Sequence, residues 1–262
     1  MRILLHTLSA RTRFHGHRIV LVIAVTMLFA CQARSELFFS IYGGWVNTEE
    51  SDVKLKQNNG TDLTIRDVQW DDESFTGSPY GGYRLGYWFD FAPHWGISGE
   101  WVHAKMIANP DQSVSVSGTR AGSPVGGIEP LGATFSELAF TYGHNLITLN
   151  MQYRWFLTEP ASRSFWSRLE PYVGTGFGVA RPYVQVTTAT SDTHEHQEAG
   201  FAWQGFAGLN LRLAKYASIF TEFKLSYADM HIDLPNGSLE VQPWSEHIVL
   251  GLSITLGKPN RR

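Results

Sequence analysis

The chain has 262 residues and a formal net charge of −3 at pH 7, from 21 Lys and Arg against 24 Asp and Glu. This balance argues against a nucleic-acid partner, because neutralising a phosphate backbone requires a basic surface. The single cysteine excludes an internal disulfide framework. A hydrophobic content of 43% suits a soluble domain and a membrane barrel equally well, whereas the aromatic content of 13% is high and is typical of aromatic girdles at two membrane interfaces.

A targeting segment opens the chain. Basic residues within positions 2–18 precede an apolar run at 19–30, which is too short to cross a bilayer as a helix. We interpret residues 1–33 as a signal peptide cleaved after Ala33, and residues 34–262 as one domain, since no linker or low-complexity tract divides them. The alternative is a lipoprotein signal in which Cys31 becomes the lipid-modified first residue.

Apolar and polar side chains alternate along residues 144–156. This period of two residues predicts a strand. The apolar side consists of Ile147, Leu149, Met151, Tyr153 and Trp155. Because that side ends in aromatic residues, and because the pattern recurs at 201–213, 217–229 and 246–256, we expect strands that face lipid on the outside and a polar filling on the inside.

The chain after the signal divides into about eight such strands. They are predicted near residues 37–47, 79–89, 95–106, 144–156, 171–186, 201–213, 217–229 and 246–256. The long, polar or Gly-rich connections are 48–78, 107–143, 187–200 and 230–245, and the tight ones are 90–94 and 214–216. The predicted fold is therefore all-β: an eight-stranded antiparallel up-and-down transmembrane β-barrel with four long outer loops, monomeric and located in the bacterial outer membrane.

The inward-facing positions of these strands carry charges that can neutralise one another. They are Arg84, Glu100, Arg154, Arg212, Glu222, Lys224 and His247. A barrel of about eight strands is filled by its own side chains, so an open transport pore is not expected. For most of these residues a structural network of salt bridges is the preferred interpretation.

The sequence resembles the lipid A oxidases of Gram-negative outer membranes and their close barrel relatives. The likeness covers nearly the whole mature chain. Its segments are 39–45 (FSIYGGW), 70–88 (WDDESFTGSPYGGYRLGYW), 99–105 (GEWVHAK), 133–155 (ATFSELAFTYGHNLITLNMQYRW), 171–180 (PYVGTGFGVA), 220–227 and 247–254. WDDESF, WVHAK and TFSELAFTYGHN are the motifs most particular to the oxidases. The chain departs from the family pattern at Asp72, where a glycine is expected, at Ser78, which replaces the first of a proline pair, and in its KPNRR ending.

This resemblance implies oxidation of the proximal glucosamine of lipid A to an aminogluconate at the outer leaflet. Molecular oxygen would be the co-substrate, a divalent cation would assist, and the partners would be lipopolysaccharide and other outer-membrane lipids. Such a reaction needs a base for the sugar hydroxyl, an oxygen or metal ligand set, and cations near the lipid phosphates. No metal ligands are assigned.

The candidate site residues lie where two strands expected to be neighbours, 95–106 and 144–156, reach the outer rim. The catalytic candidates are His103, His144, Glu100 and Glu137, and the substrate-binding candidates are Lys105, Asn145 and Tyr142. We expect them to gather at one height near the lipid headgroups, as a weak metal site or a base with a phosphate clamp. The competing interpretation is that such Lys and His side chains snorkel to the interface without a catalytic role.

Three other assignments remain open. Lipid A deacylation would need a serine, a histidine and a carboxylate, and Ser245 and His247 share a strand face, but Glu246 points to the other face. A second cluster, His194, Glu195, His196 and Glu198, has a spacing that favours a solvated loop over a metal site. The chain could also be a non-enzymatic OmpA-like barrel that serves envelope integrity or surface interaction.

Overall fold

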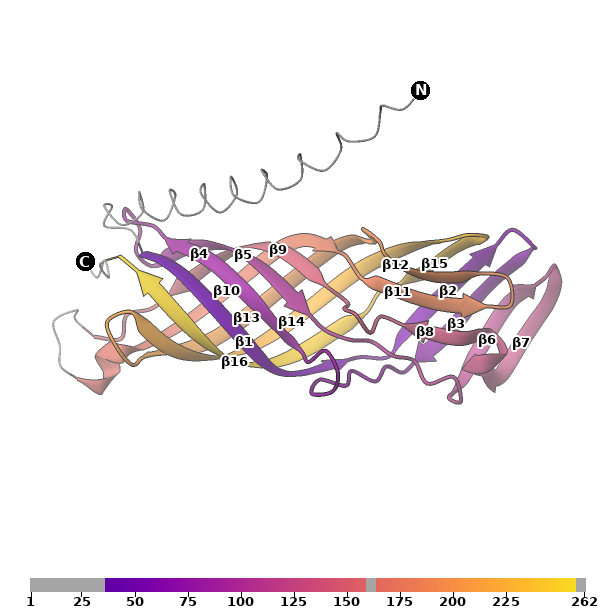
Figure 1. Cartoon of the computed structure of the whole chain (residues 1–262), viewed down its shortest axis with the longest axis horizontal. Coiled ribbons are helices and arrows are strands. Elements are labelled where there is room, and N and C mark those ends of the chain that lie inside the picture. The colour runs from indigo at the N-terminus through magenta and orange to yellow at the C-terminus, as the bar shows by residue number, and fades with distance from the viewer. Residues whose placement is uncertain (1–35, 159–163, 258–262) are drawn as a thin grey trace, which may run out of the picture.

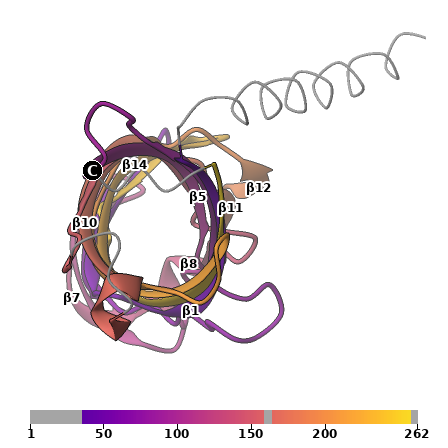
Figure 2. The ribbon, with the colours of Figure 1, turned by 90° about the vertical axis from the view of Figure 1, so that its left-hand side faces the viewer.

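The computed structural model describes residues 36–158 and 164–257. The predicted signal peptide, its cleavage after Ala33 and the alternative role of Cys31 lie outside these residues. Eight strands close into an antiparallel ring (Figures 1 and 2). They are β1 (Glu36–Thr48), β4 (Gly81–Trp88), β5 (Trp95–His103), β9 (Leu146–Arg154), β10 (Leu169–Ala180), β13 (Gly200–Arg212), β14 (Ala217–Leu234) and β16 (Trp244–Leu256). Closure through the β1–β16 pair leaves the ring without a free edge, so the predicted eight-stranded barrel is confirmed.

The outer wall of this ring is apolar. Leu149 on β9 is 67% exposed and Leu250 on β16 is 66% exposed, while the residues between the apolar positions are buried. Exposed apolar side chains on every strand, including aromatic ones towards both ends, form the belt that a bilayer covers. No helix in residues 36–158 and 164–257 is long and apolar enough to span a membrane.

A charged network fills the lumen at the middle of the barrel. Arg84 bridges Glu100 at 3.0 Å and Glu222 at 2.8 Å, and the Lys224 ammonium contacts both carboxylates. The hydroxyl of Tyr42 also donates to Glu100. Two carboxylates and two cations thus balance in a space closed to solvent, as the inward-facing charges predicted. At the end where β1 begins, Arg154 pairs with Glu36, and Arg212 pairs with Glu170.

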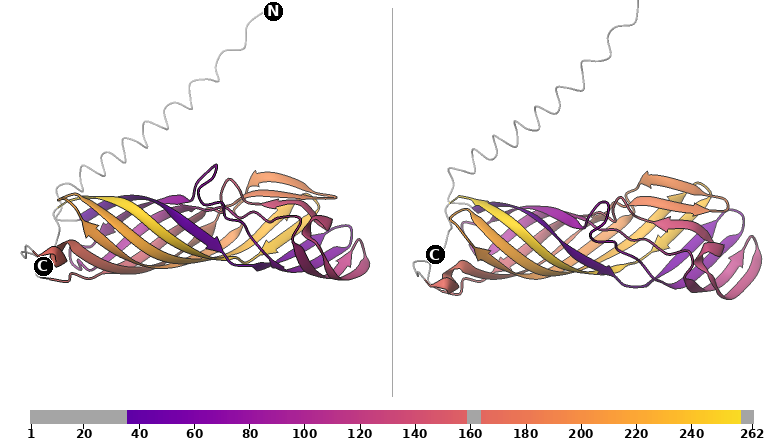
Figure 3. Two further views of the ribbon diagram at one scale, coloured as in Figure 1. Left: turned by 90° about the horizontal axis from the view of Figure 1, so that it is seen from below. Right: turned by 60° about the horizontal axis from the view of Figure 1, so that its bottom comes forward.

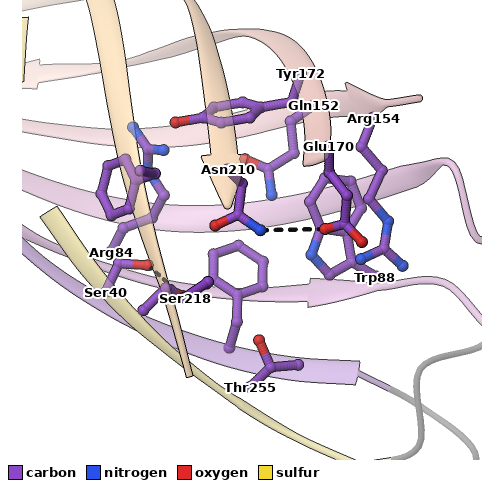
Figure 4. A pocket seen from close by; sticks show the side chains of 13 residues that line it. Ser40, Arg84, Trp88, Gln152, Arg154, Glu170, Tyr172, Asn210, Ser218 and Thr255 are labelled. Carbon is purple, nitrogen blue, oxygen red and sulfur yellow. Dashed lines mark hydrogen bonds between the residues drawn. The ribbon is translucent and has the colours of Figure 1, made fainter. Parts of the chain in front are cut away.

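Between these two groups of charges the lumen keeps a cavity of about 60 Å³, large enough only for water (Figure 4). Its walls carry hydrogen bonds from Asn210 to Glu170 at 3.1 Å and from Ser40 to Ser253 at 3.0 Å. Because the cavity is so small and the charged network lies against it, the barrel offers no open path along its axis, in agreement with the prediction that it is not a pore.

The four long connections predicted at the outer end are present, and they contain further strands that the sequence did not predict. β15 (Gly237–Val241), β2 (Ser51–Gln57), β3 (Thr61–Val68), β6 (Ser113–Arg120) and β7 (Ser123–Pro130) extend the ring sheet from the outer half of β14, and β8 (Phe135–Ala139), β11 (Tyr183–Thr188) and β12 (Asp192–His196) form a separate sheet. A short 3-10 helix, η1 (Leu131–Ala133), joins them. Both sheets project beyond the barrel, away from the end of the C-terminal strand (Figure 3).

These outer strands fold because their apolar sides face inward. Val53, Leu55, Leu63 and Ile65 are at most 1% exposed and belong to a core above the charged network. This part of the chain therefore has the opposite polarity from the membrane part, with an apolar inside and a polar outside.

A single strand predicted at 171–186 is divided in the structure, which corrects that boundary. β10 ends at Ala180, and β11 begins at Tyr183 in the second sheet. Pro182 lies at the break and has no N–H to donate to a ladder. At the opposite end of the barrel, the connection between β9 and β10 contains the 3-10 helix η2 (Phe165–Arg168). The other two connections at that end, from β4 to β5 and from β13 to β14, are short turns.

The charged network should carry a large part of the barrel's stability. Replacing Lys224, which is fully buried, by Met leaves two carboxylates against one guanidinium, and we expect the free energy of unfolding to fall by about 3–5 kcal/mol. Urea unfolding in detergent, followed by tryptophan fluorescence, measures this. The control is Lys54→Met, which removes an exposed pair at 3.8 Å and should cost less than about 1 kcal/mol. Equal effects of the two substitutions would contradict the assignment.

Candidate functional site

A groove of about 870 Å³ lies on the lipid-facing side of the barrel at its outer rim. Its walls are apolar side chains of β1, β4, β5, β14 and β16, and residues 75–79 of the connection between β3 and β4 also line it. The lining includes Ile41, Tyr83, Trp101, Ile219, Leu250 and Leu252. Stacked rings of Tyr83 and Trp101 form part of the wall, with centroids 5.6 Å apart. The groove therefore opens towards the membrane and not into the lumen.

Two glycines, Gly43 and Gly81, leave the groove open because they have no side chains to fill it. The pairing registers place Leu250, Gly43, Gly81 and His103 side by side on β16, β1, β4 and β5, all with the outward parity. Because Gly43 and Gly81 have no side chains, the wall between Leu250 and His103 is hollow at this height. A larger residue at Gly81 would also meet the Tyr42 carbonyl at 2.8 Å.

A serine, a histidine and an asparagine are connected at the polar end of the groove. The Ser78 hydroxyl lies 2.8 Å from Nε2 of His103, and Nδ1 of His103 lies 3.0 Å from Oδ1 of Asn145. Ser78 and His103 line the groove. His103 is 7% exposed and its ring stacks on Trp101, whereas Ser78 is exposed.

The hydrogen bonds determine the tautomer of His103. Nδ2 of Asn145 donates to the Arg181 carbonyl at 3.3 Å, so Oδ1 is the atom that faces the imidazole. His103 must then donate from Nδ1, and its Nε2 accepts from the Ser78 hydroxyl. Gly143, at φ 119°, leaves room for the Asn145 amide, because a Cβ there would lie 2.3 Å from Oδ1.

A lysine lies beside this chain of hydrogen bonds. The Lys105 ammonium donates to the Thr76 carbonyl and to the Glu73 carboxylate at 3.3 Å. Hydrogen bonds from Thr76 and Lys105 lower the pKa of Glu73. Asp72, at the position where the resemblance to the lipid A oxidases predicts a glycine, accepts from the backbone and the hydroxyl of Thr48 and so fixes the loop to β1.

His144 occupies a different environment. It lies in the connection between β8 and β9, outside the membrane-spanning strands, is 2% exposed, and its Nδ1 has no hydrogen-bond partner among the described residues. Burial lowers its pKa to about 4, so it is neutral at physiological pH. Its backbone N–H donates to the Ala104 carbonyl at 2.6 Å, which ties the connection to the end of β5.

The expected gathering of all seven candidates is only partly correct. β5 and β9 are neighbours, and they bring His103, Lys105, His144 and Asn145 to the outer rim. Glu100 lies instead in the lumen network, because its parity on β5 is inward. Glu137 belongs to the outer sheet, where it accepts from Gln185, and Tyr142 is 65% exposed and packs on Tyr183.

The other sequence candidates are structural or solvent-facing. Ser245 bonds to Thr48, and His247 bonds to Ser226 at 2.8 Å inside the barrel, so these residues face no lipid. His194 belongs to β12, on the surface beside Asp192. Among residues 36–158 and 164–257, no three His, Cys, Asp or Glu side chains form a group that could hold a metal ion. Ser78 was not predicted as a site residue from the sequence. The signal that pointed to it was that a serine stands where the resemblance predicts the first of two prolines.

Burial of neutral His144 should make the fold acid-sensitive. The unfolded chain binds a proton at His144 below about pH 6.5, whereas the folded chain does so only below about pH 4. The free energy of unfolding should therefore decrease as the pH falls from 6.5 to 4, by up to about 3 kcal/mol. Urea unfolding at several pH values should show a flatter dependence for His144→Gln, and the exposed control His196→Gln should keep the wild-type slope. A wild-type slope in His144→Gln would refute this account.

No family model and no curated protein matches the chain. Solved structures of Neisserial surface protein A (8% identity, TM-score 0.39), OprG from Pseudomonas aeruginosa (17%, 0.34) and the outer membrane protein AlkL (16%, 0.38) are similar to it. Each comparison covers 85% of this chain, and 97%, 96% and 90% of the other chain respectively. Similarity at this level says nothing about substrate or activity. The closed ring, the apolar belt and the paired lumen charges make the chain an eight-stranded β-barrel of the bacterial outer membrane.

Proposed function

We propose that this barrel takes an acylated glycolipid of the lipid A type from the outer leaflet into its lateral groove and modifies it at the rim. The observation that carries the proposal is the groove itself, which has apolar walls, opens through the lipid-facing wall and ends at His103 and Ser78. Acyl chains suit the walls, and a polar headgroup suits the outer end. The closed lumen argues against transport as the main function.

Contacts between distant segments support lipid A as the occupant. Lys105 binds Glu73, and His103 binds Asn145. These contacts join the segments 70–75, 101–105 and 134–145. They are the three segments through which the sequence resembles the lipid A oxidases most specifically, and they meet beside the groove. On this resemblance, the modification is oxidation of the proximal glucosamine to an aminogluconate, with two electrons passing to molecular oxygen. His103 is placed to act as the base.

A second candidate is a non-enzymatic surface barrel. Strand β7 pairs only with β6 among the described residues, and its side chains are largely exposed. An unpaired strand edge in an ordered outer sheet can add a strand from another protein. This function would leave lipid A unchanged.

Mass spectrometry of lipid A from a Gram-negative host, with and without this chain, tests the proposal. We expect a gain of one oxygen on the sugar if the resemblance holds, and any change in acyl content would also support modification. An unchanged mass, together with no lipid A bound to the purified barrel in native mass spectrometry, would overturn the proposal and leave the surface barrel.

Filling the groove should prevent binding. Leu250→Trp places a large ring in the hollow beside Gly43, and we expect at least a tenfold weaker retention of lipid A because the acyl chains lose their space. The control is Leu149→Trp, at a position that is as exposed to lipid but does not line the groove. Equal retention by the two variants would place the bound lipid elsewhere on the barrel. Heat-modifiable mobility on gels verifies folding.

A further inference from the structure

We infer that Ser78, His103 and Asn145 form an acyl-transfer relay, and that the groove is the binding site of an acyl-ester hydrolase for membrane lipids. This inference rests on the proposed lipid occupant of the groove and gives that site a reaction that the resemblance does not imply. The three groups are connected in the required order, nucleophile to base to orienting group, at 2.8 and 3.0 Å.

The directions of the hydrogen bonds fit this role. Nε2 of His103 is the acceptor, since Nδ1 donates to Asn145, whose amide is held by the Arg181 carbonyl. The Ser78 hydroxyl therefore gives its proton towards the imidazole, as a nucleophile must. A neutral asparagine is sufficient as the third group, because its task is to hold the ring and its tautomer.

Exposure separates this relay from the buried pair of the same type. The pair of Ser226 and His247 has the same 2.8 Å distance, but both residues are at most 1% exposed and lie in the lumen. Ser78 is instead exposed on the wall of the groove, on the residue 75–79 segment that lines it. A lipid in the groove can reach the Ser78 hydroxyl, whereas none can reach Ser226.

The reaction needs no oxidant or cofactor. The Ser78 oxygen attacks the ester carbonyl carbon while its proton moves to Nε2 of His103. The ester C–O bond then breaks, the leaving alcohol takes that proton, and the acyl group stays on Ser78. Water, deprotonated by the same nitrogen, attacks the acyl-enzyme, and a fatty acid leaves as the Ser78 hydroxyl is restored.

Lys105 places a positive charge next to the loop that carries Ser78. Its Nζ lies 3.5 Å from the position that a Cβ would occupy at Gly77, the residue before Ser78. Thr76 and Glu73 account for two of its three N–H donors. Lys105 is 5% exposed and does not line the groove, so its charge acts on the site through the field around the loop that carries Ser78, without direct contact with the lipid.

A covalent probe tests the nucleophile directly. The refolded full-length mature barrel in detergent is treated with a long-chain alkyl fluorophosphonate, and peptide mass spectrometry locates the adduct. We expect labelling at Ser78, and its loss in Ser78→Ala and in His103→Ala. Ser136→Ala, at an exposed serine of the outer sheet, should label like the wild type. Absence of any adduct on Ser78 in the folded wild type would overturn the relay.

Hydrolysis is then measured on two substrates in separate vesicles, lipid A and a diacyl glycerophospholipid. Release of fatty acid from either, reduced about 10³-fold or more by Ser78→Ala, supports the relay. Release only from the glycerophospholipid would support the relay while contradicting lipid A as the substrate. Retained lipid A binding with no fatty acid released from either lipid would overturn the relay alone. A gain of oxygen with no release of fatty acid would do the same and would favour the oxidase.

Asn145 is a positioning residue, and its variants separate positioning from folding. Asn145→Ala should lower kcat with little change in KM, because the Nδ1–H loses its acceptor and the His103 tautomer is no longer fixed. Asn145→Asp restores an acceptor and should recover most of the rate, with a pH–rate profile that is shifted upward because a carboxylate favours the protonated imidazole. A rate in Asn145→Asp no higher than in Asn145→Ala would remove Asn145 from the relay.

Discussion

The structure depends on the match between each strand's inward side and the surroundings of the barrel at that height. β14 shows this within one strand of 18 residues. In the membrane half, Glu222 and Lys224 face the lumen and Phe223 faces lipid, whereas further out Ile232 faces inward and Asp233 faces water. The strand keeps its parity, but the side that must be apolar changes from the outside to the inside as the strand leaves the bilayer.

The candidate site lies at this boundary, on the outward side. His103 points to the same side of β5 as Trp101, which belongs to the lipid-facing wall. It is nevertheless buried, because neighbouring residues such as Trp101 cover it on the outside of the barrel. Polar groups at this height can reach both a lipid acyl region and a headgroup. The lumen network stabilises the barrel and is not part of this site, since its carboxylates are already balanced by Arg84 and Lys224.

The membrane strands could be predicted from the sequence because lipid outside and charge inside give a strong period of two. The outer strands could not, because their apolar residues face inward and their connections resemble polar loops until the core is known. Within the site, His103 and Asn145 were predicted together because β5 and β9 are neighbours. Glu100 was predicted both as an inward-facing charge and as a rim candidate, and the structure confirms only the first, because its inward parity on β5 places the carboxylate in the lumen. Ser78 was missed because only the folded loop brings it to His103.

The closed lumen has a consequence for how molecules reach the groove. With Arg84, Glu100, Glu222 and Lys224 blocking the axis, the groove is connected only to the plane of the membrane and its outer surface. A lipid that occupies the groove as proposed must arrive by lateral diffusion within one leaflet. Saturation of the protein is then governed by the mole fraction of that lipid among its neighbours, a two-dimensional quantity, and not by any concentration in the surrounding water.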